Sequence, residues 1–137
     1  MEPKIDRRAC NRVKLIKWPT KILIKDKSID GITRNISVYG VFIYYFQPHG
    51  KNLPLQLHQV VDLIIEAPGV APLFISAEVI WSNILSSDEK NTLLGVGLRF
   101  IEVPDKERQF LHDFVTVYTD PMLNRTYKHL WNKDSPG

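Results

Sequence analysis

Short runs of apolar and β-branched residues, separated by polar or Pro- and Gly-rich breaks, occupy most of the chain. Such residues favour strands, and strands that recur at this spacing are typical of a small antiparallel barrel or sandwich. Breaks are expected at 47–56, with Pro48, Gly50 and Pro54, and at the polar turn 86–91. Six segments fit the strand pattern: Lys21–Lys25, Ile29–Ile36, Val41–Phe46, Val60–Glu66, Leu73–Trp81 and Thr92–Phe100.

A single clear helical pattern follows these strands. Its apolar residues recur at helical spacing on one face: Leu111, Phe114, Val115 and Tyr118. Pro104 suits the first helical position, and Asp120 followed by Pro121 suits the end. We therefore expect a helix over 104–120, with its apolar stripe closing one end or face of the β structure.

The last segment, 121–137, carries a shorter pattern. Four apolar residues are spaced for one helical face: Leu123, Tyr127, Leu130 and Trp131. Amphipathic spacing does not identify what the face packs against. A second helix packed on its own domain and a docking or dimerisation surface both remain open.

Composition limits the chain to an ordinary globular domain. The 137 residues, 44% hydrophobic and 24% charged, suit one domain with one core. The longest apolar run, 38–46, is too short to cross a bilayer, and the N-terminus lacks a signal-peptide pattern. We expect a cytoplasmic location and no membrane insertion. The single cysteine, Cys10, excludes an internal disulfide and a zinc site built on paired cysteines.

Positive charge is concentrated near the N-terminus. Residues 1–34 carry ten Lys/Arg and four Asp/Glu, a net charge of +6, whereas the remainder carries eight and eleven, a net charge of −3. A basic first quarter favours a phosphate-bearing partner, which could be a small molecule, a nucleic acid or a lipid.

No arrangement of residues indicates catalysis. The four histidines are scattered, and neither a Gly-x-Ser-x-Gly nucleophile elbow nor a P-loop occurs. Gly95-Val96-Gly97 resembles part of a dinucleotide fingerprint but lacks the third glycine and lies in a strand pattern. We therefore expect a binding module and not an enzyme, with no metal and no cofactor.

The first candidate binding motif is Arg7-Arg8-Ala9-Cys10-Asn11-Arg12. Guanidinium groups can grip phosphates bidentately, reach the O6 and N7 acceptors of guanine, or stack on a base. Arg8 and Arg12 are four residues apart, which spans at most about 14 Å, so both can hold one compact dinucleotide. Arginine-rich N-termini are common, so the motif alone is weak evidence.

The second candidate motif is Asn35-Ile36-Ser37-Val38-Tyr39-Gly40, at the junction of two expected strands. The amide of Asn35 suits a guanine edge, Ser37 offers a hydroxyl donor, and Gly40 allows a tight turn or close approach of a ligand. An ordinary hairpin turn uses the same residue types. This segment alone therefore does not distinguish a ligand site from a turn.

Together the two motifs resemble the PilZ domain family. Arg-x-x-x-Arg is followed just over twenty residues later by Asn-x-Ser-x-x-Gly, and Ala77–Trp81 and Leu94–Phe100 look like two further strands of that family. The similarity covers roughly 7–118. It implies a six-stranded antiparallel β-barrel with a C-terminal helix, and binding of cyclic di-GMP by a mobile arginine segment.

The resemblance also implies which residues contact cyclic di-GMP. The matched positions are Arg7, Arg8, Arg12, Asn35, Ser37, Gly40 and Trp81. Arg7 precedes the first motif arginine, a position the family associates with an intercalated ligand pair. Asn35 stands where many relatives have Asp, which removes a strong acceptor and suggests modest affinity. Trp81 either lies against a guanine or is a barrel residue.

These features define a domain plan and a function. We expect a PilZ domain over 1–120, with a basic N-terminal strap (1–17), the barrel (18–103) and the helix (104–120), followed by the tail 121–137. The expected function is a cyclic di-GMP receptor whose strap moves and signals to a downstream protein, in motility or biofilm regulation. A ligand-independent PilZ-fold adaptor is the alternative. Single-stranded nucleic acid, which exposed Tyr39, Tyr44 and Tyr45 could bind, is the least favoured partner.

Overall fold

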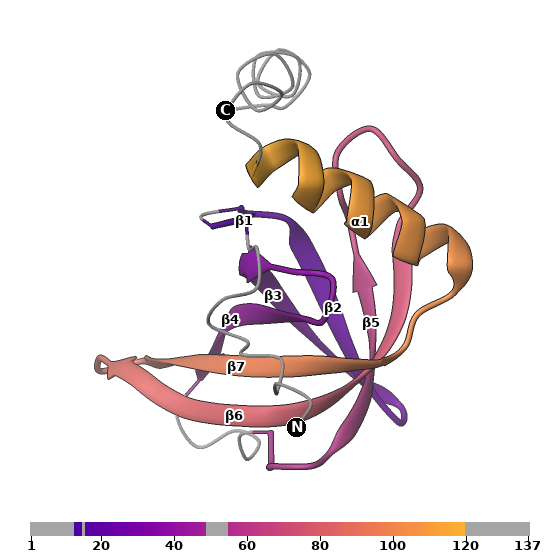
Figure 1. Cartoon of the computed structure of the whole chain (residues 1–137). Coiled ribbons are helices and arrows are strands. Elements are labelled where there is room, and N and C mark those ends of the chain that lie inside the picture. Colours follow the sequence, from indigo (N-terminus) through magenta and orange to yellow (C-terminus); the bar gives the residue numbers. More distant parts are fainter. Residues whose placement is uncertain (1–12, 15, 49–54, 120–137) are drawn as a thin grey trace, which may run out of the picture.

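The computed structural model describes residues 13–14, 16–48 and 55–119 of the chain (Figure 1). Seven strands and one helix occur in this part. The elements are β1 (Val13–Lys14), β2 (Pro19–Ile24), β3 (Lys27–Ile36), β4 (Gly40–Pro48), β5 (Val60–Ile65), β6 (Leu73–Ser87), β7 (Asn91–Glu102) and α1 (Asp105–Thr119).

The six longer strands close into an antiparallel barrel. They pair in the order β3-β2-β5-β6-β7-β4, and β4 pairs again with β3 to complete the ring. The short strand β1 pairs with the far end of β3, which β2 does not reach, through Val13↔Ile36 and Lys14↔Asn35. The predicted six-stranded barrel with a C-terminal helix is therefore confirmed.

Most strand boundaries differ from the expected ones by one or two residues, and three differences are informative. Strand β6 continues to Ser87, well past Trp81, although the alternation of buried and other residues stops after Val79. Register shifts also interrupt its ladder with β7 at Val79/Trp81 and Ile84/Ser86. Strand β4 includes Pro48, at its exposed end. Lys25 lies outside β2, in a tight turn with a positive φ of 54°. Residues 49–54 of the expected loop lie outside the described part of the chain.

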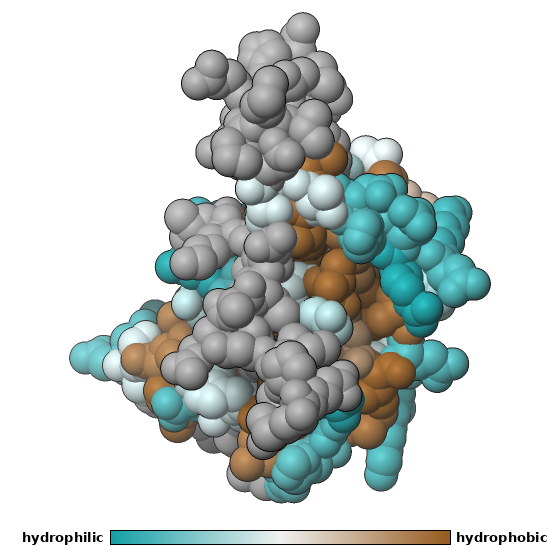
Figure 2. Space-filling model, in the orientation of Figure 1, coloured by the Kyte–Doolittle hydropathy of each residue, from teal (hydrophilic) through white to brown (hydrophobic). Residues whose placement is uncertain are grey.

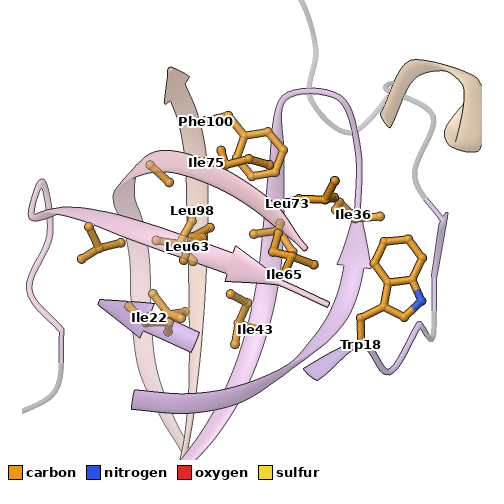
Figure 3. Packing of buried hydrophobic residues seen from close by; sticks show 14 of the residues in the cluster. Trp18, Ile22, Ile36, Ile43, Leu63, Ile65, Leu73, Ile75, Leu98 and Phe100 are labelled. Atoms are coloured by element: carbon orange, nitrogen blue, oxygen red, sulfur yellow. The ribbon is translucent and has the colours of Figure 1, made fainter. Parts of the chain in front are cut away.

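The barrel interior is filled by alternate residues of its strands (Figure 3). On β4, Val41, Ile43 and Tyr45 point inward. On β7 the inward set is Leu94, Val96, Leu98 and Phe100. Burial raises the pKa of the Tyr45 hydroxyl, which accepts a hydrogen bond from the Leu55 N–H at 3.3 Å.

Helix α1 covers one end of the barrel (Figure 1). Its inner face buries Leu111, Phe114 and Val115, and the Phe114 ring packs against Trp18 with a centroid distance of 4.8 Å. The opposite face of α1 is largely hydrophilic (Figure 2). The expected apolar stripe is therefore confirmed, although the helix begins at Asp105 instead of Pro104. No helix in the described residues is long and apolar enough to cross a membrane.

A buried threonine joins the residues before β2 to β3. The Thr33 hydroxyl accepts a hydrogen bond from the Trp18 N–H at 2.9 Å and donates one to the Ile16 carbonyl at 2.9 Å. Thr33 is almost fully buried, so neither backbone group has ready access to water. This contact holds Trp18 where α1 packs against it.

Candidate functional site

The turn between β3 and β4 is built around the side chain of Ser37. Its oxygen accepts hydrogen bonds from the N–H groups of Tyr39 (3.1 Å) and Gly40 (3.2 Å). The Ser37 N–H in turn donates to the Gly40 carbonyl at 2.9 Å. Ser37 is buried, so its hydroxyl shapes the turn from within.

Gly40 is required by the close approach of β7. It pairs with Arg99, and a Cβ at this position would lie 2.2 Å from the carbonyl oxygen of Leu98. The Phe100 N–H also donates to the Tyr39 carbonyl at 2.8 Å, which fastens the turn to β7. Only glycine fits here without separating the strands.

A small cavity opens on the outer face of the barrel beside this turn. Its lining residues come from β3, the turn, β4, β6 and β7: Asn35, Ser37, Tyr39, Gly40, Val41, Phe42, Ile80, Gly97, Leu98 and Arg99. The cavity volume of about 60 Å³ is too small to enclose a nucleotide. It can therefore serve only as the floor of a larger site. A register shift between Thr33 and Asn35 brings the Asn35 side chain into this lining.

Arg99 is the one charged residue among the described residues that line the cavity. Its guanidinium donates to one carboxylate oxygen of Glu78, the residue opposite it on β6. The other Glu78 oxygen contacts Nδ1 of His58 at 2.8 Å. The hydrogen bond to His58, and next that to Arg99, lowers the pKa of Glu78. The carboxylate therefore stays ionised and keeps Arg99 in place.

An outer row of aromatic rings begins next to the cavity. The Trp81 ring lies 5.0 Å from the Phe42 ring, and Phe42 lies 5.3 Å from Tyr44, edge to face. The Arg34 guanidinium stands over Tyr44 at 5.6 Å from the ring centroid. Trp81 is 39% exposed and does not line the cavity, but it contacts Phe42, which does.

A second, larger hollow lies elsewhere on the outer surface, along β3, β4 and the residues before β2. Its volume is about 470 Å³. The lining residues are Ile16, Lys17, Asp30, Gly31, Ile32, Thr33, Arg34, Tyr44, Tyr45, Phe46 and Leu93. Ile32 and Phe46 are 50% and 66% exposed, so the hollow has an apolar rim.

The structure brings some of the expected site residues together. Asn35, Ser37 and Gly40 line one cavity, and Trp81 lies beside it. The three expected arginines lie outside the described residues: Arg7, Arg8 and Arg12.

One detail of the nucleic-acid alternative is wrong. Tyr45 is buried in the barrel and Tyr44 is half-buried beneath Arg34, which leaves Tyr39 as the one well-exposed ring of the three. Inward positions Val41, Ile43 and Tyr45 alternate along β4, and this period of two already indicated the burial of Tyr45.

Sequence reasoning also missed Arg99, Glu78 and His58. Arg99 and Glu78 are far apart in sequence and meet only through the β6–β7 register, for which the sequence offers no signal. No group of three or more His, Cys, Asp or Glu side chains that could hold a metal ion occurs in the part of the chain that the structure describes.

Solved structures with the same fold include three proteins of 14–21% identity. The PilZ domain of Escherichia coli YcgR with c-di-GMP has a TM-score of 0.67 and 14% identity, over 93% of this chain and 99% of that one. The Bacillus subtilis inhibitor of motility MotI/DgrA has a TM-score of 0.62 and 21% identity, over 85% of this chain and 55% of that one. The K. pneumonia MrkH–c-di-GMP complex has a TM-score of 0.64 and 14% identity, over 90% and 56%.

This chain therefore spans about half the length of MotI/DgrA and MrkH. No curated protein sequence matches it. A family model described as "PilZ domain" matches residues 6–116, most of the chain. The chain therefore belongs to the PilZ domain family, whose domains are non-catalytic c-di-GMP receptors.

Proposed function

We propose that this domain binds cyclic di-GMP between the cavity beside the Ser37–Gly40 turn and the arginines Arg8 and Arg12. The observation that carries the proposal is the pairing of β1 with β3. Val13 and Lys14 pair with Ile36 and Asn35, the strand residues just before the turn. Arg12 is bonded directly to Val13, so the β1–β3 pairing supports a site that the cavity and the arginine motif share.

The chemistry of the ligand suits the two parts of this site. Cyclic di-GMP carries two phosphates and two guanines, and arginine forks bind both kinds of acceptor. The cavity supplies the amide of Asn35 and a close-approach floor at Gly40. The Trp81 ring, which is exposed beside Phe42, offers a stacking surface for a base at the edge of the cavity.

Ligand binding would change the conformation of the N-terminal strap, and this change would be the signal to a partner protein. MotI/DgrA is described as an inhibitor of motility and MrkH as a c-di-GMP-dependent transcription factor. By analogy, we place this domain in the bacterial cytoplasm, in the control of motility or biofilm formation.

Isothermal titration with cyclic di-GMP tests the proposal. Wild type should bind, and Arg8→Ala and Arg12→Ala should each weaken binding by about 2 kcal/mol or more, since each removes a charge-assisted contact. Arg108→Ala, in the exposed first part of α1, is the matched control and should bind like wild type. Absence of binding by wild type, or unchanged binding by both motif variants, would disprove the proposal.

The same titration gives the number of ligands bound. Arg7 precedes the motif, and its position favours two intercalated molecules per chain. Arg7→Ala should then lower the stoichiometry towards one, with the Arg8 and Arg12 contacts kept. A wild-type stoichiometry of one would remove the role that we assign to Arg7.

A ligand-independent adaptor is the second candidate function, and the apolar hollow of about 470 Å³ with its exposed Phe46 and Ile32 favours it. The tail residues that suggested a docking surface (Leu123, Tyr127, Leu130 and Trp131) lie outside the described part of the chain. Two variants separate the functions in the host bacterium. An adaptor loses its phenotype in Phe46→Ser and keeps it in the double variant Arg8→Ala/Arg12→Ala, whereas a receptor shows the reverse.

A further inference from the structure

The side chain of Arg99 is a cation that Glu78 holds in place beside the cavity, and it lies outside both sequence motifs. Arg99 shares the cavity with Asn35 and Gly40, and its side chain is 39% exposed. We propose that Arg99 reads the O6/N7 edge of one guanine of cyclic di-GMP, with Glu78 as its positioning residue. This inference rests on the proposed function and adds a determinant of base specificity to it.

The two strands that flank Arg99 leave it open on one side only. On β6 its opposite residue is Glu78, which occupies one flank of the guanidinium. On β4 its opposite residue is Gly40, which has no side chain. No side chain from β4 therefore covers the Arg99 side chain at this position, and the space that a Gly40 Cβ would take is filled by the backbone of Leu98. The cavity lies beside both residues, because Gly40 and Arg99 both line it.

Arg99 retains donors for a ligand after its ion pair is made. A guanidinium carries five N–H donors, and the hydrogen bond to Glu78 uses the Nη2 group. Glu78 is itself held by Nδ1 of His58 through its second oxygen. Rotation of the carboxylate would break one of the two contacts. The remaining guanidinium donors therefore keep a set direction, as recognition of a planar edge requires.

The surroundings favour a base over a phosphate as the group that Arg99 contacts. Glu78 already balances the charge of Arg99, which weakens its net attraction for an anion. Four of the lining residues are apolar: Val41, Phe42, Ile80 and Leu98. A flat aromatic base is compatible with such walls, whereas a phosphate would lose hydration there. Arginine bidentate to O6 and N7 is also the commonest specific contact to guanine.

A guanine contact at Arg99 predicts discrimination against adenine. Adenine keeps N7 but carries an amino donor in place of the O6 acceptor, so it cannot accept two hydrogen bonds from the guanidinium group. Wild type should therefore bind cyclic di-GMP more tightly than cyclic di-AMP, which has the same cyclic phosphate backbone. Part of that preference should depend on Arg99.

Titration of both dinucleotides into wild type and three variants tests this inference. Arg99→Met should weaken cyclic di-GMP binding roughly tenfold or more and change cyclic di-AMP binding much less, so that the preference shrinks. Arg99→Lys keeps the ion-pair partner for Glu78 and the charge but lacks the fork. Arg99→Lys should also lose the preference for cyclic di-GMP over cyclic di-AMP, and it replaces Arg99→Met in the test if that variant fails to fold. Arg108→Met, on the exposed surface of α1, is the control and should change neither affinity.

The role of Glu78 is tested by a double-mutant cycle. Glu78→Gln alone should reduce the preference for cyclic di-GMP, but in the Arg99→Met background it should reduce it no further. An additional loss of preference in that background would assign Glu78 a separate role and overturn its positioning of Arg99.

Each outcome separates this inference from the proposed function. If wild type binds neither dinucleotide, the proposed function fails. If Arg8→Ala and Arg12→Ala weaken binding but wild type shows no preference for cyclic di-GMP, or both Arg99 variants keep the wild-type preference, only the Arg99 inference fails. Equal losses for both dinucleotides would assign Arg99 to the phosphates and also overturn the inference.

Discussion

The two faces of β7 show how differently one strand can be constrained. Its inward residues are all apolar and buried: Leu94, Val96, Leu98 and Phe100. Its outward residues between them are Gly95, Gly97 and Arg99. The inner face needs volume and hydrophobicity, which several residue types can supply. The outer face needs the absence of a side chain at two positions and a particular charge at the third.

The outer glycines make room for the side chains of neighbouring strands. A Cβ on Gly97 would lie 3.3 Å from the Cβ of Trp81, and one on Gly95 would lie 3.0 Å from the Phe42 ring. The Gly-x-Gly pair is therefore explained by the rings that cover it, not by a dinucleotide fingerprint. Inner-face changes should alter stability most, and outer-face changes should alter the site most.

The largest expected effect comes from emptying the inner face. Leu94→Ala removes a side chain that is 1% exposed and leaves a cavity, so the free energy of unfolding should fall by about 2–5 kcal/mol. Urea denaturation measures the change. Ile101→Ala, at an outward position that is 44% exposed on the same strand, is the control and should cost less than about 0.5 kcal/mol. Similar losses in both variants would refute the contrast between the faces.

The next largest effect is expected at Gly40, where β7 approaches the turn closely. Gly40→Ala places a methyl group against the backbone oxygen of Leu98 and should cost about 1–3 kcal/mol or more, with loss of cyclic di-GMP binding. Gly95→Ala is the comparison, since its new methyl group meets the movable side-chain ends of Leu85 and Phe42. In a thermal melt, Gly95→Ala should lose less stability than Gly40→Ala. A Gly40→Ala variant with wild-type stability and affinity would contradict the geometry.

A polar residue inside the barrel should behave unlike its apolar neighbours. Thr33→Val keeps the shape of the side chain but leaves the Trp18 N–H and the Ile16 carbonyl without their hydroxyl partner. The cost should be about 1–3 kcal/mol in chemical denaturation. Thr33→Ser retains the hydroxyl and should recover most of the loss. If the serine variant is no more stable than the valine variant, the hydrogen bonds are not the cause.

The smallest expected effect concerns pH and the outer ion pairs. The folded-state pKa of Glu78 lies below its ordinary value of 4.5, so its stabilisation is present above about pH 4.5 and is lost as pH falls through the folded pKa. Thermal melts across this range should show wild type losing stability on acidification more than Glu78→Gln does. Parallel curves for the two proteins would show that the carboxylate adds no stability.

The barrel could be anticipated because its inner face repeats with a period of two over six strands. The 82–87 part of β6 could not, because it carries a register shift and none of its residues is buried. Strand β1 has only two residues, too few for any periodic signal. Strand order depends on long-range pairing, which no local pattern contains.

The motif residues of the site could also be anticipated, because Asn35, Ser37 and Gly40 are adjacent in sequence. The role of Ser37 within the turn was harder to predict, because it depends on burial and on which N–H groups donate hydrogen bonds to its oxygen. Arg99 could not be found from the sequence at all. Its importance arises from Glu78 on one neighbouring strand and the bare Gly40 on the other.

The pairing of β1 with β3 also has a consequence for the strength of ligand capture. In the proposed site, Arg12 is joined to the cavity wall through Val13, so once the cavity held the dinucleotide, the arginine contact would be intramolecular. Its strength then follows the effective concentration of the arginines, which reaches the millimolar range for short flexible connections and falls as they lengthen. Glycines inserted between Arg12 and Val13 would therefore weaken capture step by step, although every contact residue would still be present.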